Sequence, residues 1–444
     1  MTSPSAVQPT EPANPTVAVS FRQALQFWVK LGFISFGGAA GQIAIMHQEL
    51  VERKQWISER QFLRALNFCM LLPGPEAQQL ATYMGWRLHG LPGGIVAGVF
   101  FVLPSVFVLL ALSWLAVTYA DIPAVSGLFY GIQGVVLAIV VDSVLRIAQR
   151  ALVHRVFLLF AVGAFVALQW LDWPFPLVIA VAAGAGVLLH GWVPRVFPHT
   201  LETRTTVIAR EAENLPSLAH NLRLIAVFAL LWGLPVGALW WWRGGSDVLM
   251  QLALFFTQAA FITFGGAYAV LTYVADVAVN QYQWLAPEQM IQGIGLAETT
   301  PGPTIMVTQY VGFIAAWHHS GTFAPGLYGT LGALVTTYVT FLPCFLFIFL
   351  GAPYIEFLAH QTRLQAALTG VTAAVVGVIA NLAVFFGNRV LFPVDILLTR
   401  LEWMLLFLAA GAFLLSRYGT WPVYWIVLLG ALIGMLWKWW GSLL

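Results

Sequence analysis

The chain has 444 residues, of which 60% are hydrophobic and only 9% are charged, and its formal net charge is +2. A soluble protein carries roughly 25% charged residues, and this chain could not cover its surface with so few. The composition therefore excludes an ordinary soluble protein. It predicts an all-α polytopic membrane protein, because helices satisfy their own backbone hydrogen bonds in lipid.

The predicted elements begin with a polar, proline-rich segment. Residues 1–20 lack the apolar core of a signal peptide and are predicted to form a disordered N-terminal tail. Apolar runs that can cross a bilayer, or nearly so, then recur along the chain. In chain order these runs are 93–118, 125–148, 155–171, 174–190, 224–242, 325–350, 364–386, 401–416 and 421–440. The resulting units are a first repeat (21–190), a cytoplasmic linker (191–223), an extra transmembrane span (224–242) and a second repeat (249–442).

The second repeat copies the first at a constant offset in sequence, which carries Phe33 onto Phe261 and which we call the repeat register. A later pair, Leu103-Pro104 and Leu342-Pro343, has a larger offset, so the second half carries an insertion near His318–Pro325. Such tandem duplication is common in transporter folds. The pairs in the repeat register are Phe33-Ile-Ser-Phe-Gly-Gly38 with Phe261-Ile-Thr-Phe-Gly-Gly266, Trp56 with Trp284, and Pro73-Gly74-Pro75 with Pro301-Gly302-Pro303.

Glycine and proline interrupt the helical pattern at an FGG motif and a PGP motif in each half. The arms on either side of Pro73-Gly74-Pro75 have about twelve residues each, too few to cross a bilayer. They form either one crossing with a broken middle or a re-entrant hairpin with its tip near the midplane. Basic residues flank both ends of this element, with Arg53 and Arg60 before it and Arg87 after it. Because basic loops face the cytoplasm, the charge placement favours the re-entrant hairpin.

Charge also predicts that the two halves have opposite orientations. The second-half loop that corresponds to the basic loop of the first half, residues 275–292, contains no Lys or Arg and carries Asp276 and Glu288. The basic side of one half therefore matches a non-basic side of the other. This pattern predicts an inverted-topology repeat, in which the extra span reverses the second half.

The four helix breaks predict an anion site near the midplane. A helix that restarts after a break presents free N–H groups and the positive end of its dipole, and such an end binds anions. Gly74 and Gly302 are expected to lie closest to the anion, since glycine lets the backbone approach. Alternatively, the glycines only allow close helix packing and the prolines only kink. The candidate substrate-binding residues are Gly37, Gly38, Pro73, Gly74, Pro75, Gln78, Gln79, Gly265, Gly266, Thr300, Pro301, Gly302, Pro303, Thr304 and Lys30.

Three ionisable residues at membrane depth are stronger candidates for a functional role, because a charged side chain is costly in the bilayer. Lys30 could attract an anion, or its side chain could extend to an interface. Glu76 and Glu298 flank the PGP tips and are candidate proton carriers. For Glu76 the alternative is a first-turn residue that stabilises its own helix. Asp142, inside a predicted span, is a weaker candidate.

The motif residues resemble one known family. The runs Phe33–Gly38, Asn67–Gln79 and Gly295–Pro303 are similar to those of the long-chain, two-domain chromate ion transporters. The resemblance covers nearly the whole chain from about residue 21, with one departure, Ala39 where family members often have proline. It implies chromate efflux across the cytoplasmic (inner) membrane of a bacterium, driven by the membrane potential or a proton gradient, and hence chromate resistance.

The sequence is compatible with rival functions. Chromate and sulfate are both tetrahedral dianions, so the sequence does not separate them, and an uncoupled oxyanion channel would use the same motifs. A membrane-embedded reductase is disfavoured, because no haem, flavin or iron–sulfur ligand pattern is present. We expect no catalytic residue, metal or cofactor, and no nucleic-acid partner. The expected partners are chromate or a sulfate-like oxyanion, protons and the lipid bilayer, with a homodimer as one assembly to be considered.

Overall fold

The structure is a computed structural model that describes residues 19–197, 216–355, 357, 361–392, 401–419 and 421–441. The predicted tail, except for its last two residues, and linker residues 198–215 lie outside the described part of the chain. All regular elements of the described residues are helical, and seven helices are long and apolar enough to cross a membrane. The helices of the first half are α1 (Phe21–Ile34), α2 (Gly38–His47), η1 (Gln48–Arg53), α3 (Glu59–Cys69), α4 (Glu76–Thr118), α5 (Pro123–Ala151), α6 (Arg155–Gln169) and α7 (Phe175–Trp192), followed by η2 (Pro194–Val196).

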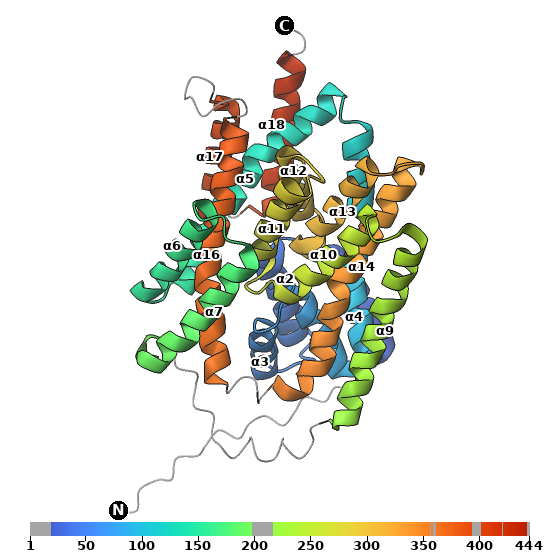
Figure 1. The fold of residues 1–444 in the computed structure, drawn as a ribbon, viewed down its shortest axis with the longest axis vertical. Helices are drawn as coiled ribbons and strands as arrows, with labels where there is room; N and C mark the ends of the chain where they lie inside the picture. The colour runs from blue at the N-terminus through green and yellow to red at the C-terminus, as the bar shows by residue number, and fades with distance from the viewer. Residues whose placement is uncertain are drawn as a thin grey trace, which may run out of the picture.

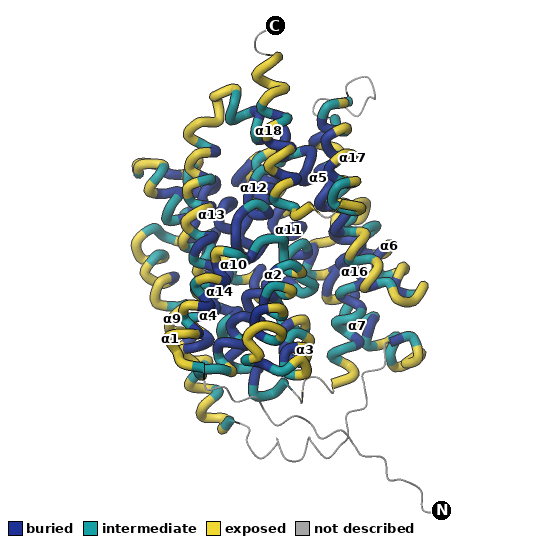
Figure 2. The backbone as a smooth tube through the Cα atoms, turned by 180° about the vertical axis from the view of Figure 1, so that it is seen from behind, coloured by how far each residue is buried: buried dark blue, intermediate teal, exposed yellow. Residues whose placement is uncertain are grey.

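The second half repeats this order after one additional helix, α9 (Leu218–Arg243). That helix contains the predicted extra span 224–242 and begins before it. It lies on the outside of the molecule (Figure 2), against α10 and α14. The helices of the second half are α10 (Val248–Ile262), α11 (Ala267–Ala275), η4 (Asp276–Gln281), α12 (Pro287–Thr299), η5 (Thr304–Met306), α13 (Val307–His318), α14 (Pro325–Gly351), η6 (Ala352–Tyr354), α16 (Thr362–Leu391), α17 (Trp403–Tyr418) and α18 (Val423–Gly441).

The repeat extends to unusual details of the backbone. The π-helical turns η1 and η4 begin at Gln48 and Asp276, which are partners in the repeat register. Gln55 and Gln283, also partners in this register, have positive φ angles of 52° and 53°. Positive φ is uncommon for a residue with a side chain. Its recurrence at matching positions means that the two halves share one local fold.

The halves enter the molecule from opposite ends. We call the end at which α7 stops and α9 starts the linker end, and the opposite end the far end. In Figure 1 the linker end is at the bottom, where α3 lies, whereas its repeat counterpart α12 lies toward the top. Helix α9 runs from the linker end toward the far end (Figure 1), so the chain changes sides before the second half begins. The inverted repeat is therefore built by one additional crossing.

The first PGP element returns to the end from which it enters. Helix α4 has two arms, because the backbone leaves helical geometry at His89 and Gly90. Gly85 of the first arm packs against the backbone of Gly93 in the second arm, which requires the two arms to run antiparallel. The imidazole Nε2 of His89 lies 2.8 Å from the carbonyl oxygen of Val19, beside the start of α1. This geometry is a re-entrant hairpin and not a broken crossing.

The second half makes the same reversal with a longer connection. Helices α13 and α14 run antiparallel, with Gly312 against the backbone of Gly332. The loop between them, residues 319–324, occupies the place of the short reversal in α4. The insertion predicted near His318–Pro325 is therefore this loop.

The two halves exchange helices in their outer part. Helix α5 of the first half packs on α17 and α18, and α16 of the second half packs on α6 and α7. The exchange is symmetric, because Gly131 of α5 meets Gly434 of α18 while Gly370 of α16 meets Gly186 of α7. Small residues of this kind allow close approach of helices in membranes. The first and second halves are therefore not separable domains.

Labelling of single cysteines tests the inversion. Ser58 and Ala286 are the residues that precede α3 and α12, and they are partners in the repeat register. We expect Ser58→Cys and Ala286→Cys to react with an impermeant maleimide from opposite faces of intact vesicles. Background labelling should be low, since Cys69 and Cys344 are both buried. Reaction of both variants from the same face would contradict the inverted repeat.

Candidate functional site

The helix breaks of opposite halves are tied together in the middle of the molecule. The N–H of Gly74 donates to the carbonyl of Thr263, with an N···O distance of 3.2 Å. The N–H of Gly302 donates to the carbonyl of Ser35 at 2.8 Å. These bonds are one interaction made twice between repeat partners, so each PGP turn is held by the FGG segment of the other half.

Glycine is required at these turns by the backbone itself. The φ angles of Gly74 and Gly302 are both 110°, in a region that L-residues rarely adopt. A Cβ atom on Gly302 would also lie 2.8 Å from Cβ of Ser105, and one on Gly74 would lie 3.0 Å from Sγ of Cys344. The N–H groups of both glycines already donate to carbonyl oxygens, so they are not free to donate to an anion. This hydrogen bonding does not agree with the expectation that Gly74 and Gly302 lie closest to the anion.

Four helix N-termini surround one small cavity. Helix α2 starts after Gly37, α11 after Gly266, α4 after Pro75 and η5 after Pro303. The cavity between them has a volume of about 20 Å³, enough for about one water molecule. A tetrahedral oxyanion is larger, so the helix ends must separate to admit one. The cavity is lined by Ala39, Gln42, Pro75, Glu76, Ala77, Gly266, Ala267, Pro303 and Thr304.

The cavity has a two-fold pattern with one chemical difference. A Cβ atom on Gly266 would lie 3.5 Å from Oε1 of Glu76, and one on Gly38 would lie 3.8 Å from Oγ1 of Thr304. Glu76 and Thr304 are repeat partners, so a carboxyl group occupies one side of the cavity and a hydroxyl group the other. Because the glutamate is absent from one half, the repeat fold does not require it.

Glu298 lies behind the second tip and is only 4% exposed. The hydroxyl of Tyr268, in the first turn of α11, donates to its Oε1 at 2.8 Å. Thr304 is also within hydrogen-bonding reach of this carboxyl group. A buried carboxyl beside a polar cavity can exchange a proton with it. Together, Glu76 and Glu298 place two titratable groups beside the helix ends.

The predicted glutamine donors are engaged with the protein. The side-chain amide of Gln79 donates to the carbonyl of Pro73 at 2.6 Å, and that of Gln78 donates to Oγ1 of Thr82 at 3.1 Å. The hydroxyl of Thr300 donates to the carbonyl of Ala297 at 3.1 Å. The bonds of Gln79 and Thr300 lie at the helix breaks, that of Gln78 lies within α4, and none of the three residues lines the cavity. Gln42, which does line the cavity, bonds to the carbonyl of Gly302.

Lys30 is not brought to the cavity. It lies on an exposed position of α1 and is not among the lining residues. This placement agrees with the alternative that its side chain extends to an interface. Of the other predicted residues, Gly265 packs on Val375 of α16, while Pro73 and Pro301 are buried within their turns.

Sequence reasoning missed the cations that do lie near the cavity. Arg150 of α5 is close enough to Glu76, and Arg146 close enough to Glu298 and Tyr268, for electrostatic interaction. Arg146 also pairs with the buried Asp142 one turn before it, at 2.7 Å. The sequence feature that could have indicated these cations is the one-turn spacing from Asp142 to Arg146 to Arg150, which puts all three residues on one helix face.

An inverted repeat whose broken helices meet in the middle of a membrane domain is the architecture of a membrane transporter. The comparisons agree: the sequence model of the family described as "Chromate transporter" matches residues 22–187 and 250–435, one match in each half. The chain belongs to the chromate transporter family. It is a multi-pass protein of the bacterial inner membrane.

Curated relatives extend over most of the chain. It is 30% identical to the "Chromate transport protein" of Cupriavidus metallidurans, with 83% of each chain covered. It is 31% identical to that of Pseudomonas aeruginosa, with 81% of this chain and 80% of the relative covered. It is 29% identical to the "Probable chromate transport protein" of Synechococcus elongatus, with 84% and 86% covered. No solved structure matches the chain.

Proposed function

We propose that the protein is a secondary active transporter that exports chromate, and related tetrahedral oxyanions such as sulfate, from the cytoplasm. The observation that carries this proposal is the meeting of four helix N-termini, two from each half, around one cavity. Helix N-termini offer N–H donors and positive dipole ends to an anion without a fixed charge. Such a site can bind a dianion and still release it.

The carboxyl groups beside the cavity support coupling to protons. Glu76 lines the cavity, and Glu298 is joined through Tyr268 to the first turn of α11. An ionised carboxylate at either place opposes a dianion, and a protonated one does not. Proton binding and anion binding at the same helix ends are therefore linked. The basic loops of the first half put the linker end in the cytoplasm, so export runs from the linker end to the far end.

Flux of radiolabelled chromate in proteoliposomes tests the proposal. We expect chromate to accumulate against its gradient when a pH gradient or membrane potential is imposed, and excess unlabelled sulfate to reduce the flux. Liposomes without protein are the control. Flux that only dissipates the chromate gradient, whatever the pH gradient or membrane potential, would indicate an uncoupled channel, and an absence of chromate flux would refute the proposed function.

A further inference from the structure

Two places in the outer helices are built from matching positions that carry different charges, and we call the place at Asp142 the linker-end entrance and the place at Asn381 the far entrance. The offset that carries Leu103-Pro104 onto Leu342-Pro343 relates α5 to α16, and it carries Asp142 onto Asn381 and Arg146 onto Phe385. A third offset relates the α6–α7 hairpin to α17–α18. It carries Trp173-Pro174 onto Trp421-Pro422 and Gln169 onto Arg417. The repeat thus permits a direct comparison of the two entrances.

The same contact is ionic at one entrance and neutral at the other. Asp142 lies 3.8 Å from the guanidinium of Arg417, and it also accepts a hydrogen bond from Ser416 at 2.7 Å. At the matching place in the other half, the side-chain amide of Asn381 donates to Oε1 of Gln169 at 2.8 Å. Because an uncharged pair makes the same connection, the fold does not need charge here.

The ionic entrance has more positive than negative charge. Asp142 is 1% exposed, whereas the side chains of Arg146 and Arg417, with which it pairs, are 47% and 26% exposed. Arg150 follows one turn later on α5 and is also exposed. Three arginines and one aspartate leave a surplus of two positive charges, which equals the charge of one tetrahedral dianion, when the neighbouring carboxyl groups of Glu76 and Glu298 are protonated.

Arg146 and Arg150 lie in the last two turns of α5. Helix α5 runs from the far end toward the linker end (Figure 1), and its Ile132 contacts Gly295 of α12, the helix that leads to the second PGP turn. Arg146 and Arg150 come after that contact. Arg146 is close enough to Glu298, and Arg150 to the cavity-lining Glu76, for electrostatic interaction.

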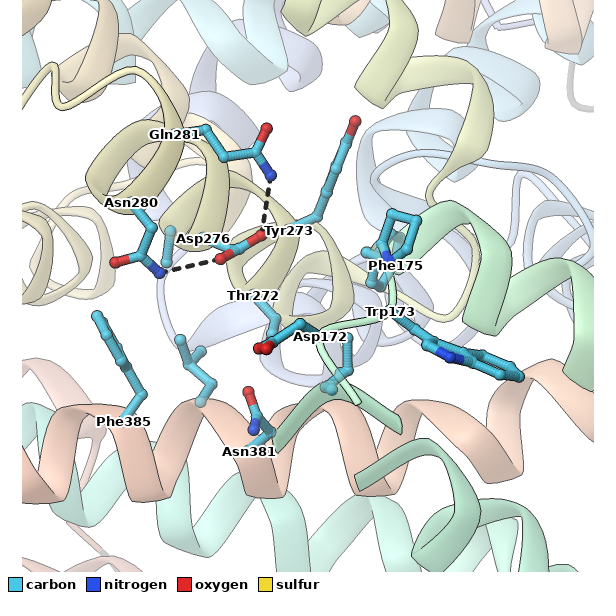
Figure 3. A pocket seen from close by; sticks show the side chains of 14 residues that line it. Asp172, Trp173, Phe175, Thr272, Tyr273, Asp276, Asn280, Gln281, Asn381 and Phe385 are labelled. Atoms are coloured by element: carbon cyan, nitrogen blue, oxygen red, sulfur yellow. Dashed lines mark hydrogen bonds between the residues drawn. The ribbon is translucent and has the colours of Figure 1, made fainter. Parts of the chain in front are cut away.

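The matching entrance in the other half lacks two of these three cations, because Phe385 and Gln169 stand in place of Arg146 and Arg417, whereas Arg389 matches Arg150. It is a pocket of about 280 Å³ between α11, η4, α16 and the loop before α7 (Figure 3). Asp172 and Asp276 line it, and Asp276 accepts hydrogen bonds from Asn280 and Gln281. No lysine or arginine is among its lining residues. Its two carboxylates oppose an approaching dianion.

We propose that Arg146, Arg150 and Arg417 form an anion-binding subsite at the linker-end entrance, which takes a tetrahedral oxyanion dianion before it reaches the helix breaks. The proposal rests on the proposed function, and it adds that the two faces of the transporter differ in the charged residues at their entrances. Asp142 keeps two of the guanidinium groups in place when no anion is bound. The apparent affinity for the oxyanion is then higher at the linker face than at the far face.

Side-specific kinetics test the subsite. Chromate flux is measured in proteoliposomes of sorted orientation, so that substrate meets one face at a time. In Arg146→Gln and Arg150→Gln, the KM at the linker face is expected to rise about tenfold, because each change removes one charge from a screened site. The KM at the far face should stay within about twofold of wild type. A substitution does not change the equilibrium distribution of chromate across the membrane, so kcat/KM must fall by the same factor at both faces. Because the far-face KM stays nearly constant, the fall at that face appears in kcat.

Matched variants separate charge from folding. Arg146→Lys keeps the charge and should restore most of the linker-face affinity. Arg389→Gln changes the repeat counterpart of Arg150 and should leave the linker-face KM unchanged. Phe385→Arg adds the missing arginine to the far entrance and should lower the far-face KM. An unchanged linker-face KM in both Arg146→Gln and Arg150→Gln, or an equal rise at both faces, would overturn the proposal.

A second measurement keeps the subsite testable if the proposed function fails. If the wild-type protein moves no chromate, equilibrium binding of radiolabelled sulfate to the detergent-solubilised full chain replaces the flux assay. A roughly tenfold loss of affinity in Arg146→Gln, with Arg389→Gln unaffected, supports the subsite. Unchanged affinity in Arg146→Gln, or no sulfate binding by the wild type, overturns it.

Discussion

Gly302→Leu is expected to abolish chromate transport and to lower the thermal stability of the purified protein. The φ angle of 110° at this position costs an L-residue about 1–2 kcal/mol. The added side chain meets Ser105 of α4 at a distance shorter than van der Waals contact, and overpacking of this kind costs about 1–3 kcal/mol. The substitution also disturbs the hydrogen bond from Gly302 to Ser35, which joins the two halves.

The repeat supplies a second variant, and the outer helices supply a control. Gly74→Leu should have the same effect, because its φ angle and its bond to Thr263 repeat those of Gly302. Gly184→Leu on α7 should have little effect, since a Cβ atom there has no neighbour within 4 Å. Transport flux and the midpoint of thermal unfolding are the two measurements. Wild-type flux in both PGP variants would mean that the paired turns are not needed for transport.

Glu298→Gln and Glu76→Gln are expected to flatten the pH dependence of chromate flux while leaving membrane insertion intact. Glutamine keeps the shape of the side chain and the hydrogen bond from Tyr268 to its oxygen, but it cannot release a proton. Glu298 has the greater expected effect, because it is buried and bonded to Tyr268. Loss of pH dependence, with flux retained down an imposed chromate gradient, would identify these carboxyl groups as the coupling groups.

Two further variants make this test specific. Glu288→Gln changes an exposed glutamate in the first turn of the same helix, α12, and should leave the pH profile unchanged. Tyr268→Phe removes the donor to Glu298 and should shift the pH profile without removing it. A wild-type pH profile in both Glu298→Gln and Glu76→Gln would exclude proton coupling through these groups.

The sequence by itself determined the membrane class, the repeat and the positions of the helix breaks. Each depends on local chemistry. Apolar runs of sufficient length predict spans, and glycine with proline interrupts a helix wherever it occurs. The pairing of Pro73-Gly74-Pro75 with Pro301-Gly302-Pro303 followed from spacing alone. Loop charge was enough to predict the inversion, because basic residues near spans set orientation.

Only the tertiary structure decided which groups meet at the breaks. The bond from Gly74 to Thr263 joins residues of different halves, and neither motif specifies that pairing. Gln78 and Gln79 have the chemistry of anion donors, yet their amides bond to the protein. Lys30 lies on an outward face of α1, whereas Arg146 lies near Glu298 because α5 packs across the halves. Hydrophobic patterns predict which residues are buried away from water. The partner of each buried polar group, however, depends on packing between segments that lie far apart in the chain.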